Sequence, residues 1–195
     1  MTTANKLTLL RVFMIPLMVI VLYLEPLKVQ TEFLNMTWST IIFSVLFVLA
    51  SLTDFLDGYI ARKYNQITTF GKFLDPIADK VLVFTALLHL MMVMPNRVPL
   101  WTVMIILVRE FMVTGVRLLA VEKGTVIAAS KWGKYKTAST MVAIIILLFN
   151  DFGLTSLNAN LVWIGNIVYY IAVFFTIYSG WDYLYKNRQV ILESV

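Results

Sequence analysis

Apolar residues in this 195-residue chain form six long blocks separated by short charged or turn-rich segments. The blocks cover roughly residues 7–24, 38–60, 77–95, 98–120, 137–151 and 160–184. Each block is about long enough to cross the ~30 Å hydrocarbon core of a bilayer as a helix. The pattern therefore predicts an all-α, polytopic membrane protein with six transmembrane helices, organised as a single domain over residues 1–195.

Composition supports the membrane interpretation. Hydrophobic residues make up 60% of the chain and the mean hydropathy is +0.83, whereas soluble domains contain roughly 45 to 50% apolar residues. Turn and helix-breaking signals such as Glu25-Pro26, Pro95-Asn96 and Lys123-Gly124 separate neighbouring blocks.

Basic residues are distributed unevenly between the two predicted sides. When alternate loops are assigned to opposite sides, only Lys28 and Arg97 lie on one of them. The other side carries fourteen: Lys6, Arg11, Arg62, Lys63, Lys72, Lys80, Arg109, Arg117, Lys123, Lys131, Lys134, Lys136, Lys186 and Arg188. The positive-inside rule then predicts cytoplasmic termini. The net charge of +5 is better explained by contact with anionic lipid than with nucleic acid, which we do not expect as a partner.

The residue inventory excludes several kinds of chemistry. The chain has no cysteine, and its single histidine, His89, lies within an apolar run, where we expect a structural role. Disulfides, thiolate nucleophiles and sulfur-ligated metals are therefore excluded. Zinc sites and Ser/His/Asp triads have almost no residues to use.

Four aspartates mark the segment that joins the second and third apolar blocks. Asp54 and Asp57 are three residues apart, and Asp75 and Asp79 are four apart, so on helices each pair would share one face. A short loop joins the two blocks, which allows the pairs to converge. Taken singly, Asp75 before Pro76 could instead be a helix N-cap.

Four carboxylates are costly in a membrane protein unless something offsets their charge. Carboxylate oxygens without His or Cys favour hard cations such as Mg²⁺ or Mn²⁺. We therefore expect Asp54, Asp57, Asp75 and Asp79 to hold two such ions against a diphosphate.

The aspartates belong to a longer pattern, DxxDGxxAR, eight residues, then GxxxDxxxD. It is met by Asp54, Asp57, Gly58, Ala61, Arg62, Gly71, Asp75 and Asp79. This pattern resembles the signature of the CDP-alcohol phosphatidyltransferases, which are six-helix membrane proteins of about this size. The resemblance implies that an alcohol displaces CMP from a CDP-linked lipid. It also implies a homodimer.

The same resemblance implies roles for individual residues. Asp79 would act as general base as well as metal ligand. The CDP moiety would be bound by Asp57, Gly58, Ala61, Arg62 and Gly71.

A second group of charges bears on the acceptor alcohol. Arg109 and Glu110 lie inside the fourth apolar block, where charge is expensive and indicates function, although the two could simply neutralise each other. The runs REFMVTGVR, SKWGKYKTAS and NKLTLLRVFMIP resemble parts of bacterial phosphatidylglycerophosphate synthases, which use glycerol 3-phosphate. Candidate residues for binding the acceptor phosphate are Arg109, Arg117, Lys131, Lys134, Thr8 and Arg11.

These inferences predict an enzyme of the bacterial cell membrane, in contact with membrane lipids, with its active site on the cytoplasmic side. Its predicted substrates are CDP-diacylglycerol and glycerol 3-phosphate. Two alternatives stay open within the family, a cardiolipin synthase and an inositol-phosphate-using relative. A divalent-cation transporter is a remote alternative from another class.

Overall fold

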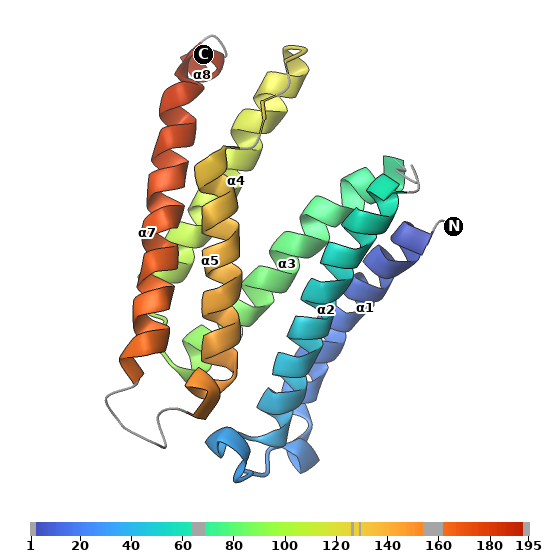
Figure 1. Ribbon diagram of the computed structural model, residues 1–195, viewed down its shortest axis with the longest axis vertical. Coiled ribbons are helices and arrows are strands. Elements are labelled where there is room, and N and C mark those ends of the chain that lie inside the picture. Colours follow the sequence, from blue (N-terminus) through green and yellow to red (C-terminus); the bar gives the residue numbers. More distant parts are fainter. Residues whose placement is uncertain (1–2, 64–68, 126, 129, 154–161, 193–195) are drawn as a thin grey trace. The chain divides into compact units, whose positions relative to one another are not determined.

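The computed structural model describes residues 3–63, 69–125, 127–128, 130–153 and 162–192. This part of the chain is helical and contains no β-strand, only an isolated bridge between Gln30 and Thr37. Its α-helices (Figure 1) are α1 (Thr3–Tyr23), α2 (Trp38–Lys63), α3 (Thr69–Val93), α4 (Leu100–Glu122), α5 (Lys131–Leu148), α7 (Val162–Lys186) and α8 (Arg188–Leu192). Three short 3₁₀ turns accompany them: η1 (Glu25–Leu27), η2 (Phe33–Asn35) and η3 (Asn150–Gly153).

The six predicted apolar blocks coincide with α1, α2, α3, α4, α5 and α7, and the predicted boundaries are off by several residues in places. Four of these helices, α1, α2, α3 and α7, are long and apolar enough to cross a membrane. Large apolar side chains such as Phe13, Met92 and Trp181 are more than two-thirds exposed on the helix surfaces. Together these features indicate a membrane protein.

The start of α3 differs from the prediction. Asp75 is not an N-cap, because α3 begins at Thr69 and Pro76 lies inside the helix. A proline at this place removes one backbone hydrogen bond, a loss that helices in membrane proteins tolerate when neighbouring groups compensate. The consequence is that Asp75 and Asp79 occupy successive turns of one helix.

The end of α4 agrees with the prediction. Gly124 follows the helix with φ +71°, a conformation that glycine adopts without strain. The amides of Gly124 and Thr125 donate to the carbonyls of Val121 and Ala120, which closes the last turn.

The chain forms two compact units. The first contains residues 1–89 and 145–161, and the second contains residues 90–144 and 162–195. In the first unit α1 packs against α2, with Met18, Phe43 and Phe47 fully buried. His89 is also buried and its ring centroid lies 4.4 Å from that of Phe43, as expected for a structural histidine.

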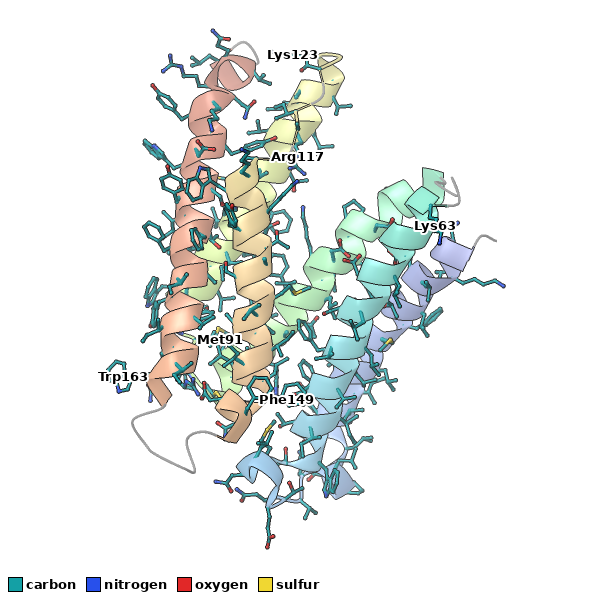
Figure 2. All side chains as sticks on the ribbon, viewed as in Figure 1. Lys63, Met91, Arg117, Lys123, Phe149 and Trp163 are labelled. Atoms are coloured by element: carbon teal, nitrogen blue, oxygen red, sulfur yellow. The ribbon has the colours of Figure 1, made fainter. Side chains whose placement is uncertain are left out.

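In the second unit α4 packs against α7. Thr102 Oγ1 of α4 lies 2.7 Å from the Tyr169 hydroxyl of α7. Arg97, in the turn before α4, donates from Nε to Asn166 Oδ1 of α7 over 2.6 Å. Trp163, at the start of α7, projects from the helix and is 66% exposed (Figure 2), as expected for an aromatic side chain at a membrane interface.

Candidate active site

Arg11, on α1, joins three of the four aspartates in the first unit. Its Nη1 lies 2.9 Å from Asp54 Oδ1 and 2.6 Å from Asp79 Oδ1, and its Nη2 lies 2.5 Å from Asp57 Oδ2. The Arg11 side chain is fully buried. One guanidinium therefore brings together carboxylates from α2 and α3.

Thr8, one turn before Arg11, contacts the fourth aspartate. Its hydroxyl donates to Asp75 Oδ1 over 2.8 Å and lies 3.5 Å from Asp57 Oδ2. All four carboxylates thus converge on two neighbouring side chains of α1. Sequence spacing predicted the convergence, and the structure adds α1 as the third wall of the cluster.

The aspartates differ in exposure. Asp57 is buried, with 6% of its side chain exposed, whereas the Asp54 and Asp79 side chains are 38% and 47% exposed. A substrate can therefore approach Asp54 and Asp79 directly, while Asp57 lies at the base of the site.

The charge of the cluster favours an additional cation. Counted with every side chain ionised, the four carboxylates and the Arg11 guanidinium together carry three formal negative charges. Oxygen donors of this kind fit Mg²⁺ or Mn²⁺. Among the described residues no three acidic or histidine side chains already have the spacing of a metal-binding group, and the Arg11 guanidinium stands between the carboxylate oxygens instead.

The residues predicted to bind CDP are described only in part. Gly58 follows Asp57 in α2, and Gly71 is buried in the first turn of α3. The side chains of Ala61 and Arg62 lie outside the described residues.

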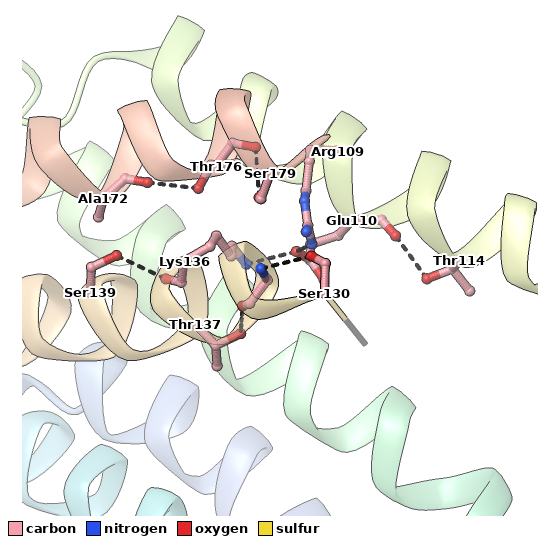
Figure 3. A network of polar contacts seen from close by, with 11 residues as sticks. Arg109, Glu110, Thr114, Ser130, Lys136, Thr137, Ser139, Ala172, Thr176 and Ser179 are labelled. Carbon is pink, nitrogen blue, oxygen red and sulfur yellow. Dashed lines mark hydrogen bonds and ion pairs between the residues drawn. The ribbon is translucent and has the colours of Figure 1, made fainter. Parts of the chain in front are cut away.

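A buried charge network occupies the second unit (Figure 3). Glu110 Oε1 accepts hydrogen bonds from Arg109 Nη1 over 2.8 Å and from Lys136 Nζ over 2.6 Å. The three side chains are between 7% and 18% exposed. Glu110 neutralises only one of its two cationic partners, so the three side chains together carry one net positive charge. Mutual neutralisation of Arg109 and Glu110 therefore does not fully explain why charged residues are buried here.

Arg109 is held by close packing. A methyl group placed on Gly180 of α7 would lie 3.0 Å from Arg109 Cγ, and one on Gly133 of α5 would lie 3.8 Å from Arg109 Nη2. Arg109 Nε is buried and has no partner among the described residues. An unpaired buried donor of this kind indicates a site where a ligand or water binds.

The other predicted acceptor residues do not join this network. Arg117 lies over the Tyr183 ring, 5.7 Å from its centroid, and Lys131 and Lys134 are exposed on the first turn of α5. Thr8 and Arg11 lie in the aspartate cluster of the first unit. Sequence reasoning did not single out Lys136 as a site residue, because it lies with Lys131 and Lys134 in the polar first half of α5 and no local signal separates the three.

Comparison with known proteins identifies the family. The family model for CDP-alcohol phosphatidyltransferase matches residues 1–178. The chain is 41% identical over 197 aligned residues to a Bacillus subtilis CDP-diacylglycerol–glycerol-3-phosphate 3-phosphatidyltransferase, with 97% of each chain covered. It is 39% identical over 180 residues to the protein of that name from Rickettsia typhi, covering 92% of this chain and 93% of the relative.

The Shigella flexneri protein of the same name is 34% identical over 194 residues, with 96% of each chain covered. Both the family match and these relatives extend through the aspartate cluster and the buried charge network. The chain belongs to the CDP-alcohol phosphatidyltransferase family.

Proposed function

We propose that this protein transfers the phosphatidyl group of CDP-diacylglycerol to sn-glycerol 3-phosphate, giving phosphatidylglycerophosphate and CMP in phospholipid biosynthesis. The names of its relatives support both substrates. The observation that carries the proposal is the convergence of Asp54, Asp57, Asp75 and Asp79 in one cluster that is partly open to substrate.

In the proposed reaction, Asp79 is the general base. An oxygen of the acceptor hydroxyl forms a bond to the phosphorus that carries the diacylglycerol, and the bond from that phosphorus to the CMP oxygen breaks. Asp79 accepts the hydroxyl proton, and CMP leaves with the electron pair of the broken bond. The half-exposed side chain of Asp79 is suited to this role.

Asp54, Asp57, Asp75 and Asp79 would hold two Mg²⁺ or Mn²⁺ ions. When bound, these ions supply charge neutralisation for the diphosphate and for departing CMP. Asp57, Gly58, Ala61, Arg62 and Gly71 would bind the CDP moiety, as the family motif implies.

Arg109 is the strongest candidate for binding the acceptor phosphate. It is buried, carries an unpaired Nε and belongs to a network with net positive charge. A guanidinium in such surroundings can bind phosphate through directed, charge-assisted hydrogen bonds. Arg117, Lys131, Lys134, Thr8 and Arg11 stay candidates for additional contacts.

We further propose that α1, α2, α3, α4, α5 and α7 all cross a bacterial cell membrane, with both termini and the active site facing the cytoplasm. The asymmetric distribution of Lys and Arg supports this orientation. By family resemblance we expect a homodimer.

Acceptor specificity is tested with purified protein in lipid nanodiscs containing CDP-diacylglycerol. We expect CMP release with glycerol 3-phosphate, loss of release with EDTA and recovery with Mg²⁺ or Mn²⁺. Release with phosphatidylglycerol but not glycerol 3-phosphate would identify a cardiolipin synthase, and release only with an inositol phosphate would identify the other relative. Metal flux into proteoliposomes without nucleotide would instead favour a transporter.

A further inference from the structure

A polar hollow lies wholly within the second unit, at the start of α5 and the end of α7. Its volume is about 410 Å³, within the range of roughly 300 to 1,000 Å³ that is usual for small-ligand sites. Its polar lining comes from Ser130, Lys131, Asp182, Tyr183, Lys186 and Asn187, with Trp132 beside them. Tyr183 is 2% exposed and packs with Val113 and Val116 of α4, so part of the wall is fixed by a small core.

The hollow borders the charge network around Arg109, and Arg109 is not part of its lining. Ser130 lines the hollow, and a methyl group placed on Gly133 would lie 3.3 Å from Ser130 Oγ and 3.8 Å from Arg109 Nη2. Arg117, which lies over the Tyr183 ring, is eight residues after Arg109 on α4, or about 12 Å further along the helix. On α7, Gly180 lies beside Arg109, and the hollow begins with Asp182 and Tyr183.

The electrostatics of the hollow favour an anion. Lys131 and Lys186 contribute two positive charges, and Asp182 offsets one of them through a 2.7 Å ion pair with Lys186. Lys131 is also the first residue of α5, an 18-residue helix whose N-terminal amides carry partial positive charge.

Two buried polar atoms at the hollow have no partner among the described residues. They are the Tyr183 hydroxyl and Asp182 Oδ2. Buried groups in native proteins are almost always hydrogen-bonded, so such exceptions point to a ligand or water. Together they call for a ligand that both accepts and donates hydrogen bonds.

Aromatic side chains adjoin the hollow. The Trp132 ring lies 4.7 Å from Tyr178 and 6.3 Å from Phe175, measured between centroids. Trp181 and Tyr185 are 73% and 61% exposed on α7. Exposed aromatic rings beside lysines are typical of the level at which lipid head groups meet acyl chains.

We propose that this hollow binds the head group of an anionic phospholipid, as a lipid site whose lining contains none of the four aspartates of the cluster. The lipid phosphate contacts Lys131 and the first turn of α5 and accepts a hydrogen bond from Tyr183. A hydroxyl of the head group donates to Asp182 Oδ2. The aromatic side chains of α7 lie against the acyl chains, which favours a lipid over a free phosphate.

Native mass spectrometry of the full chain in detergent tests this site, with phosphatidylglycerol, phosphatidylcholine and inorganic phosphate as separate probes. We expect saturable phosphatidylglycerol binding that Lys131→Met weakens about fivefold, the equivalent of one contact between lysine and anionic lipid. Tyr183→Phe, which removes only the unpaired hydroxyl, should also weaken binding. Lys134→Met is the matched control, because Lys134 is an exposed lysine in the same turn that does not line the hollow.

Phosphatidylglycerol binding that is equal in wild type, Lys131→Met and Lys134→Met would overturn the proposal, as would equal affinity for phosphatidylcholine. Inorganic phosphate that binds in a Lys131-dependent manner while lipid does not would replace the lipid by a free phosphate. A thermal unfolding curve for each variant identifies any that fails to fold. Tyr183→Phe keeps the test decisive in that case, since it retains the ring that packs in the core.

Discussion

Arg11 is a fully buried cation whose three carboxylate partners come from two other helices. A buried ion pair adds little net stability over an apolar replacement of the whole group, yet loss of one partner leaves uncompensated charge. Arg11 therefore matters for the aspartate cluster in two ways. It positions the carboxylates, and it offsets part of their mutual repulsion.

Arg11→Met is expected to destabilise the protein by about 3 kcal/mol, because Asp57 is then buried without its cation. Mg²⁺ or Mn²⁺ should recover part of the loss by supplying positive charge. Thermal unfolding with EDTA and with added metal measures both effects. Lys28→Met is the control, since it removes an exposed lysine that is also paired with a carboxylate, Glu25. An unchanged midpoint for Arg11→Met would contradict the proposed role.

Asp79→Asn should lower kcat by about 10² to 10⁴-fold, the range for loss of a general base, with little change in binding of CDP-diacylglycerol. Asp57→Asn should instead shift the Mg²⁺ titration to higher concentration, because it removes a buried carboxylate that we propose as a metal ligand. Steady-state CMP release at several metal concentrations separates the two results. Near-normal turnover in Asp79→Asn would remove it as the base.

At the scale of elements, much of the helical arrangement follows from the sequence. The apolar blocks predicted the six long helices, and the three- and four-residue spacings placed each aspartate pair on one helix face. The apolar block that predicted α3 begins at residue 77, eight residues after the observed start of the helix, because the first turns of α3 carry Lys72 and Asp75 and are less apolar than the rest. The partners of Arg11 could not be predicted, because its contacts span at least 43 residues of sequence.

Charge explains why α4 and α5 are less clearly membrane-spanning than the other long helices. Arg109, Glu110 and Arg117 lie in α4, and Lys131, Lys134 and Lys136 lie in α5. The sequence predicted a functional role for these charges. It could not show that Glu110 joins Arg109 to Lys136, because that contact depends on how α4 and α5 pack.

Glu110→Gln should leave Arg109 and Lys136 as two close, uncompensated cations, which would move apart. We expect the KM for glycerol 3-phosphate to rise about tenfold, equivalent to ~1.4 kcal/mol of binding, with the KM for CDP-diacylglycerol unchanged. Initial rates with each substrate varied in turn measure this. Glu122→Gln, at the exposed end of α4, is the control, and equal KM values in both variants would exclude a positioning role for Glu110.

The packing of α7 against Arg109 gives a second prediction at this scale. Gly180→Ala places a methyl group 3.0 Å from Arg109 Cγ, so the arginine must shift and acceptor binding should weaken severalfold, as expected when a binding group is displaced. Gly115→Ala is the matched control, because nothing lies within 4 Å of its added methyl. The KM for glycerol 3-phosphate is compared between Gly180→Ala and Gly115→Ala. Equal values would show that Arg109 can accommodate the added methyl group without losing acceptor binding.

At the scale of the whole molecule, orientation in the membrane is testable because the chain has no cysteine. Lys28→Cys should react with a membrane-impermeant maleimide added to bacterial spheroplasts, in which the outer face of the cell membrane is accessible and the membrane is still sealed. Lys63→Cys and Lys134→Cys should react only after the membrane is opened. All three positions are exposed, so reversed labelling would invert the proposed topology.

The fully enclosed guanidinium at Arg11 also bears on how the protein is made. A nascent chain that carried four acids and no internal counter-ion would need a metal before its helices could assemble. With Arg11 already among the carboxylates, assembly in the bilayer can precede metal loading. With the proposed metal dependence, newly inserted protein is expected to be folded but inactive when Mg²⁺ is scarce, and to gain activity on metal addition without further synthesis.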